Sequence, residues 1–220
     1  MAQDVAITSS TPRALSEAQD RLLWLDRSGA LVIMDFFTKA VMDGYGYQVR
    51  AGTVTTPLVG DVAITDTAAE MCVDIANGGT MFPIASQISF RAGTGTAHEM
   101  AIKSVTGASS AGTAFVLLPL KSNGEAASLA TARVQAAGAV TVTAELATTT
   151  QRHWEYAQQA VLTTGSPMEL SWEPLRPPRL VGTSSASRCL YVQIAAATTG
   201  PSYYAHLDVL QIPTVLLGST

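Results

Sequence analysis

Charge is the scarcest property of this sequence. Only 14% of its 220 residues are charged and 47% are hydrophobic, whereas an average soluble domain carries about 25% charged residues. Aromatic residues are also few, at 6%. A soluble surface generally needs more charge than this to resist association. The composition therefore leaves two possibilities, insertion into a membrane or burial of much of the surface in an assembly.

Long hydrophobic runs are also absent. The longest, Ala30–Met34 and Ala114–Leu120, fall far short of the ~20 residues of a membrane-spanning helix. A transmembrane barrel would show many alternating segments with aromatic girdles, and aromatic residues are too few for that. We therefore expect no membrane contact and interpret the low charge as a sign of assembly.

Basic clusters, a secretory signal and a disulfide framework are missing too. The net charge is −4 and the densest basic cluster is Arg176–Arg179, whose prolines indicate a rigid loop, so we expect no nucleic-acid partner. The first residues lack a basic stretch before an apolar one. Cys72 and Cys189 lie far apart in apolar segments, which favours free buried thiols over a disulfide. These features predict a protein made and assembled in a cytoplasm.

Catalytic motifs are absent as well. The chain has three histidines, at positions 98, 153 and 206, and no G-x-S-x-G elbow accompanies them. His206 with Asp208, and His153 with Glu155, would share a strand face and could each form half of a metal site, but no third ligand can be placed. We therefore expect no metal, no cofactor and no enzymatic activity.

Three weaker signals have plainer interpretations. Gly107–Thr113 resembles a phosphate-binding loop but lacks its lysine and a following helix. A carboxylate pair for glycoside hydrolysis would have to come from acids that are scattered, as on any sheet surface: Asp61, Asp66, Asp74, Glu99, Glu145, Glu155, Glu169 and Glu173. Trp24, Trp154 and Trp172 could stack on sugars, but buried anchoring is the favoured interpretation, so we expect no small-molecule ligand.

Most of the sequence consists of segments in which apolar and polar residues alternate. We expect about ten strands separated by turn signals, and long helices between strands are missing, which predicts an antiparallel β-sandwich. Among them are Glu70–Asn77, Pro83–Ala92, a segment running through Val140 and Val142, and a last strand with Tyr203, Ala205, Leu207 and Val209 on one face. Val59–Asp66 is a further expected strand.

The N-terminal part differs from this pattern. Residues 1–29 are expected to form an arm and a short helix, because Ser16 and Gln19 have capping-box spacing and Gly29 provides a stop. A strand and turn over Leu22–Met34 is the alternative, because Asp26–Gly29 has the residues of a turn. Residues 30–220 are expected to form one sandwich domain. Ala30–Met42 could be a helix or a buried strand, and its β-branched and aromatic content favours a strand.

The segment Gly78–Phe90 poses a question about its second face. Ile84, Ser86, Ile88 and Phe90 would lie on one side of a strand, and Ala85, Gln87 and Ser89 on the other. The second side is neutral and small. We therefore expect it to face another sheet or another subunit.

Two Gly-Thr-Pro segments resemble a known family. Gly52, Thr53, Thr56 and Pro57, followed by Gly79, Thr80, Pro83 and Ile84, are similar to strand openings in the jelly-roll cement (decoration) proteins of tailed bacteriophage capsids. The similarity covers residues 40 to 92. It implies a jelly-roll-like sandwich and a structural virion protein that trimerises and stabilises a phage head. It brings no catalytic residues.

The resemblance also implies partners and a place. They are further copies of the chain, the major capsid protein, and the capsid of a virion assembled in the host cytoplasm. Two alternatives remain within viral structure: a single-jelly-roll capsid protein, and a receptor- or glycan-binding head of a fibre or spike. The latter would use Trp154, Tyr156, Tyr203 and Tyr204. A cupin-like enzyme is a third.

Overall fold

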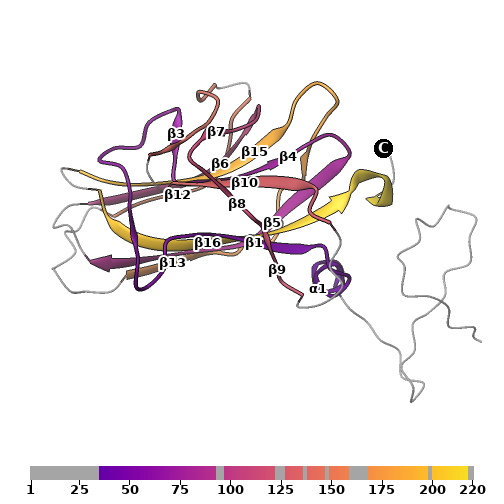
Figure 1. The fold of residues 1–220 in the computed structure, drawn as a ribbon, viewed down its shortest axis with the longest axis horizontal. Helices are drawn as coiled ribbons and strands as arrows, with labels where there is room; N and C mark the ends of the chain where they lie inside the picture. Colours follow the sequence, from indigo (N-terminus) through magenta and orange to yellow (C-terminus); the bar gives the residue numbers. More distant parts are fainter. Residues whose placement is uncertain are drawn as a thin grey trace, which may run out of the picture.

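The chain folds as an all-β sandwich in a computed structural model. The structure describes residues 35–92, 97–121, 127–135, 138–146, 149–158, 168–197 and 200–217. Two large antiparallel sheets lie face to face, and a small third sheet lies outside one of them (Figure 1). None of the helices in these ranges is long and apolar enough to cross a membrane.

The first large sheet has seven strands. Its main order is β13-β5-β16-β1-β9, with β14 pairing to β5 and β2 to β16. The bounds are β1 Gly46–Ala51, β2 Leu58–Val59, β5 Gly79–Ala92, β9 Leu118–Pro119, β13 Met168–Trp172, β14 Leu180–Val181 and β16 Ser202–Pro213. β16 lies at its centre, paired along almost its whole length with β5 and along half of it with β1.

The second large sheet has six strands in the order β12-β6-β15-β4-β10-β8. The bounds are β4 Met71–Ile75, β6 His98–Thr106, β8 Thr113–Phe115, β10 Ala130–Val134, β12 Gln151–Gln158 and β15 Arg188–Ala196. β15 is paired over its full length with β6. The chain crosses between the two large sheets at most of its long connections.

The third sheet is small and covers the outer face of the six-stranded sheet. It joins β3 (Ala68–Ala69), β11 (Val140–Thr141) and β7 (Ser110–Ala111). Val140 and Val142 are buried against a cluster that includes Val105 and Tyr191 of the larger sheet. The six-stranded sheet is therefore covered on both faces over this region.

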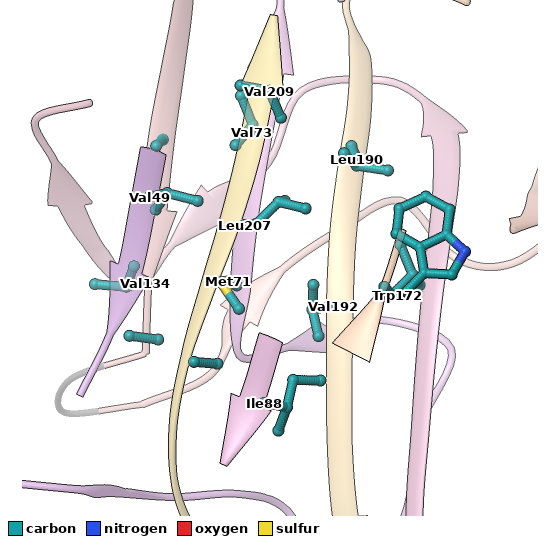
Figure 2. Close-up of a cluster of buried hydrophobic side chains, with 14 of the residues drawn as sticks. Val49, Met71, Val73, Ile88, Val134, Trp172, Leu190, Val192, Leu207 and Val209 are labelled. Atoms are coloured by element: carbon teal, nitrogen blue, oxygen red, sulfur yellow. The ribbon is translucent and has the colours of Figure 1, made fainter. Parts of the chain in front are cut away.

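The main core lies between the two large sheets. Val49, Ile88, Leu207 and Val209 from the seven-stranded sheet meet Met71, Val73, Leu190 and Val192 from the six-stranded one (Figure 2). Alternation puts these side chains on the inner faces, as predicted for the face of β16 that carries Tyr203, Ala205, Leu207 and Val209. Small and β-branched side chains fill most of this layer.

The prediction of a strand over Ala30–Met42 is wrong where the structure describes it. Phe36–Met42 is an α-helix, α1. Asp35 caps it, because its Oδ1 accepts hydrogen bonds from the amides of Phe37 and Thr38 at 2.9 and 3.0 Å. The cap outweighs the β-branched and aromatic content. The predicted helix near Ser16 and the boundary at residue 29 lie outside the described residues.

A β-bulge corrects the prediction for Gly78–Phe90. Asp208 pairs with Ala85 and Val209 with Pro83, so Ile84 is an extra residue in β5. A bulge shifts the alternation by one residue. Ile84 therefore lies on the outer face with Phe82, packed against the cluster around Leu210, and not with Ile88 and Phe90 in the core.

Two further strand predictions are wrong. In Val59–Asp66 only Val59 belongs to a strand, and Asp61 adds a single bridge to Ala195. The segment through Val140 is not one long strand, because β10 and β11 belong to different sheets. The alternating pattern fits β10 and β11 alike, but it does not show that the chain leaves one sheet and enters another between them.

Candidate functional site

Four buried side chains meet on the outer face of the six-stranded sheet. Cys72 and Asp74 come from β4, Cys189 from β15, and Ser109 from the loop before β7. Cys189 lies directly opposite Asp74 in the strand pairing, and Cys72 is two residues away on the same face. One ligand atom from each cysteine and from Asp74 lies within 4.8 Å of the others. We call these four residues the cysteine cluster.

Ser109 joins the cysteine cluster through hydrogen bonds. Its amide donates to both carboxylate oxygens of Asp74, at 3.2 and 3.1 Å, and its hydroxyl donates to Asp74 Oδ2 at 2.5 Å. The Cys72 thiol in turn donates to Ser109 Oγ at 3.0 Å. A hydrogen bond with Cys72, burial and the nearby Asp74 carboxylate raise the pKa of the Cys189 thiol well above its ordinary value.

The loop that carries Ser109 is the segment that resembled a phosphate-binding loop. It begins at Gly107 (φ +127°) and ends at Gly112 (φ +60°), and Ala111 also has a positive φ of 54°. A Cβ on Gly107 would lie 2.3 Å from Thr143 Oγ1, so glycine is required there for space as well as for conformation. The glycines of this motif shape a loop over the cysteine cluster.

An ion-pair network lies beside the cysteine cluster. Glu145 accepts from Lys103 Nζ at 2.8 Å and also pairs with Arg152, which in turn lies 3.4 Å from Glu155. Lys103 is only 5% exposed. Its hydrogen bond, together with that from Arg152, lowers the pKa of the Glu145 carboxyl. A buried lysine needs such a partner because an unpaired buried charge is costly.

A cavity of about 500 Å³ opens above this network, lined by Asp66, Glu145, Leu146, Thr150 and Arg152. Beneath it, Tyr191 pairs across the strands with Lys103, which pairs with Arg152, so the three side chains share the outer face. The buried Tyr191 hydroxyl has no hydrogen-bond partner among the described residues. Burial, and then the charge of Glu145, raise its pKa.

Sequence reasoning missed the most buried acid. Glu70 is 1% exposed and accepts a hydrogen bond from the Ile194 amide at 2.8 Å. Burial, followed by repulsion from Asp61, raises the pKa of its carboxyl well above the ordinary range. Its only sequence signal is its position at the start of the expected strand Glu70–Asn77, which does not distinguish it from the other acids.

The structure separates one of the two predicted histidine–acid pairs. A bulge at His153 places its Nε2 2.9 Å from Ser104 Oγ, with its ring stacked on Trp172, while Glu155 contacts Arg152 on the other face. The prediction that His153 and Glu155 share a strand face is therefore wrong, because the bulge breaks the alternation of side chains.

His206 and Asp208 share the outer face of the seven-stranded sheet as predicted, in the row formed by alternate residues of β16. Asp208 Oδ1 accepts a hydrogen bond from Gln48 Nε2 at 2.7 Å, so one oxygen of this carboxylate already has a partner. Burial raises the pKa of the Asp208 carboxyl. His98 is buried in the core region, with its ring 4.7 Å from that of Phe90.

The aromatic residues that the receptor-binding alternative would use do not form one exposed platform. Tyr203 is 0% exposed and lies in the core, so its ring cannot stack on a sugar. Trp154 and Tyr156 stack on each other at 6.1 Å and are half-buried against the core. Tyr204 lies on the outer face of the other sheet, and Trp24 lies outside the described residues.

Among the other predicted acids, Asp66 and Glu145 line one cavity, and Glu155 is joined to Glu145 through Arg152. Glu169 lies on β13, where it accepts a hydrogen bond from Gln87 Nε2. Glu99 lies on β6, where it is paired with Ala157 of β12 and Ala195 of β15. Asp74 and the two free, buried cysteines are predicted residues that the fold brings into one buried cluster. That grouping depends on the register of β4 with β15, which the sequence does not display.

One end of the sandwich is apolar on its outside. α1 and the 3-10 helix η1 (Thr214–Leu217) lie at this same end (Figure 1), over a cluster formed by Ala40, Leu210 and Ile212. Phe36 is 49% exposed, Met42 53% and Val215 76%. We call Phe36, Met42, Val215 and the partly buried Phe37 and Leu216 beside them the apolar end.

Comparisons of this chain with known proteins identify no relative: no family model, no curated protein and no solved structure matches it.

Proposed function

We propose that this protein is a structural virion protein of the capsid-cement type, which assembles as a trimer and binds a major capsid protein on a phage head. The strand order is the observation that carries the proposal. Numbered along the chain, β1, β4, β5, β6, β12, β13, β15 and β16 are strands one to eight. One sheet then runs six-three-eight-one and the other five-four-seven-two.

This order supports a jelly roll, in which eight strands form two Greek keys divided between two sheets. Viral capsid domains, lectins and cupins use that fold. Among these classes, the 14% charge favours a capsid component, because much of the surface of such a protein is covered by neighbours. The choice is an analogy of fold, strengthened by composition.

The apolar end supports self-association. Phe36 packs edge-on against Phe37 and Phe82 with ring centroids 5.3 and 6.0 Å apart, which fixes the exposed ring in place. Exposed apolar patches on soluble proteins commonly mark interaction sites. We propose a second copy of this chain as the occupant, since cement proteins contact each other as well as the lattice.

The test is the oligomeric mass of the untagged protein and of Phe36→Asp, measured by size-exclusion chromatography with light scattering. A charge at the centre of an apolar interface is strongly unfavourable, so Phe36→Asp should shift the trimer to monomer at micromolar concentration. Val54→Asp is the matched control. Val54 is 62% exposed and follows the end of β1 that points away from α1, so that variant should stay trimeric.

Two results would contradict this assignment. If Phe36→Asp and Val54→Asp have the same mass as the unchanged protein, the apolar end is not the interface. If the unchanged protein binds glycans on an array and is monomeric, the receptor-binding alternative replaces the cement function. Circular dichroism of each variant separates loss of association from loss of the fold.

A further inference from the structure

We propose that Cys72, Asp74 and Cys189 form a binding site for Zn²⁺, closed from above by Ser109. The inference is independent of the proposed virion function, because it rests only on the cysteine cluster. It departs from the expectation of no metal that the sequence alone supports.

The strand register creates the ligand set. Cys189 and Asp74 are direct cross-strand partners between β15 and β4, and Cys72 projects from the same face of β4. The three ligand atoms lie within 4.8 Å of one another. A tetrahedral zinc ion bonded to sulfur at ~2.3 Å and to oxygen at ~2.0 Å holds such atoms about 3.5 to 3.8 Å apart. Small side-chain rotations therefore suffice to bring them to bonding distance.

The donor chemistry selects the metal. Thiolates are soft ligands that favour zinc over magnesium or calcium, and cysteine sulfur and aspartate oxygen are both zinc ligands. Binding replaces the two thiol protons, which pass to solvent, and each sulfur then donates a lone pair to the ion. The fourth position falls to the Ser109 hydroxyl, which already lies 3.0 Å from Cys72 Sγ.

The surroundings of Asp74 are those of a metal ligand. Its carboxylate is 6% exposed, and no lysine, arginine or histidine among the described residues forms an ion pair with it. Buried carboxylates are generally paired with a cation or bound to a metal. The Ser109 amide holds both oxygens in position, as partners of metal ligands commonly do.

The loop above provides access. Ser110 and Ala111, which follow Ser109, are exposed, and glycines flank the segment at Gly107 and Gly112. An ion can therefore reach the cysteine cluster by displacement of this short segment and its β7 pairing with β11, without opening the main core. Once bound, it would tie the loop to β4 and β15.

The experiment uses untagged full-length protein, reduced and stripped with a chelator, so that no histidine tag competes for metal. Equilibrium dialysis against Zn²⁺ followed by elemental analysis should give one zinc per chain. Substitution with Co²⁺ should give the near-ultraviolet absorption of sulfur-to-cobalt charge transfer, which requires thiolate ligands. Bound zinc should also raise the melting temperature, because the folded state alone holds the site.

Variants assign the ligands. Cys72→Ser and Cys189→Ser should each abolish the charge-transfer band, and Asp74→Asn should weaken zinc binding at least tenfold. Ser104→Ala is the matched control, because Ser104 is an equally buried small polar residue of the same sheet, and its hydroxyl contacts His153 and not the cysteine cluster. It should bind one zinc with an unchanged spectrum.

Three outcomes would overturn the inference. The first is wild-type protein, folded by circular dichroism, that takes up no zinc and shows no cobalt–sulfur band. The second is a band that persists in Cys189→Ser. The third is a Cys72–Cys189 disulfide in protein purified under nitrogen, shown by the absence of titratable thiols in denaturant.

Discussion

The two faces of the six-stranded sheet are both buried, but they are buried in opposite ways. The inner face presents Met71, Val73 and Ile75 to the other large sheet. The outer face of the same strand presents Cys72 and Asp74 to the small sheet. The inner layer is apolar, whereas the outer layer combines apolar contacts with hydrogen bonds among Cys72, Asp74 and Ser109.

This difference separates what holds the fold together from what could give it a site. Apolar burial stabilises by ~25 cal/mol per Å² without regard to direction. A buried polar layer contributes little net stability, yet the loss of one partner is costly for the others. We therefore expect substitutions on the inner face to act on folding and those on the outer face to act on specific neighbours.

Leu190→Ala should have the largest effect. Leu190 is fully buried on the inner face of β15, and removing its branched side chain leaves a cavity that costs about 2–5 kcal/mol of unfolding free energy. Urea denaturation measures it. Leu190→Met, which conserves volume, should cost less than ~1.5 kcal/mol. Equal losses for both variants would show that shape matters more than volume here.

Asp74→Ala should come next. It leaves the Ser109 amide and hydroxyl, now hydrogen-bonded to the carboxylate, without an acceptor, which costs about 1–3 kcal/mol. Asp74→Asn keeps one carbonyl oxygen and should lose about half as much. The urea midpoints of both variants should be measured on metal-free protein. If Asp74→Ala were as stable as the unchanged chain, the outer layer would not depend on its hydrogen bonds.

Glu70 should make stability depend on pH. Its carboxyl pKa is raised in the folded state, chiefly by burial, so the folded chain holds this proton more tightly than the unfolded chain. Stability from this group is complete below the ordinary pKa of 4.5 and falls as pH rises from there toward the folded-state pKa. Glu70→Gln should remove that part of the slope in melting temperature against pH. An unchanged slope would refute the assignment.

Gln87→Lys should have the smallest effect on the fold. Gln87 lies half-exposed on the outer face of the seven-stranded sheet, across from His206. Surface substitutions of this kind change stability by about 0.5 kcal/mol or less, so the melting temperature of one subunit should hold. If another subunit covers this face, the variant should lower the oligomer mass in light scattering. An unchanged mass would make the face solvent-exposed.

The prediction for that face needs a correction as well as a test. Ala85, Gln87 and Ser89 do not face the other sheet of their own chain, because the second sheet packs on the side of Ile88 and Phe90. The face is also not neutral across strands, since Arg50, Asp208 and Glu169 share it. Contact with another subunit stays a prediction.

The sequence predicted elements well where period-two alternation was unbroken. β16 was predicted with its buried face, because alternate apolar residues identify a half-buried strand. It failed where a local interaction overrides the pattern, as at the Asp35 cap of α1 and the bulge at Ile84. Both features depend on specific hydrogen bonds of the folded chain, which the pattern of apolar residues does not reveal.

The cysteine cluster could not be predicted for a different reason. Cys72 and Cys189 are 117 positions apart, and only the pairing of β4 with β15 brings them together. β4 is buried on both faces, so its pattern of burial does not reveal which side carries the polar residues. The register of β4 against β15 depends on the packing of the whole sheet, so it cannot be deduced from the single sequence.

The most direct test of the proposed self-assembly is the mass of the protein by sedimentation equilibrium across micromolar concentrations. We predict a species of three times the 23.0 kDa chain mass that persists on dilution. A single 23.0 kDa species at every concentration would contradict self-association, and with it our interpretation of the low charge.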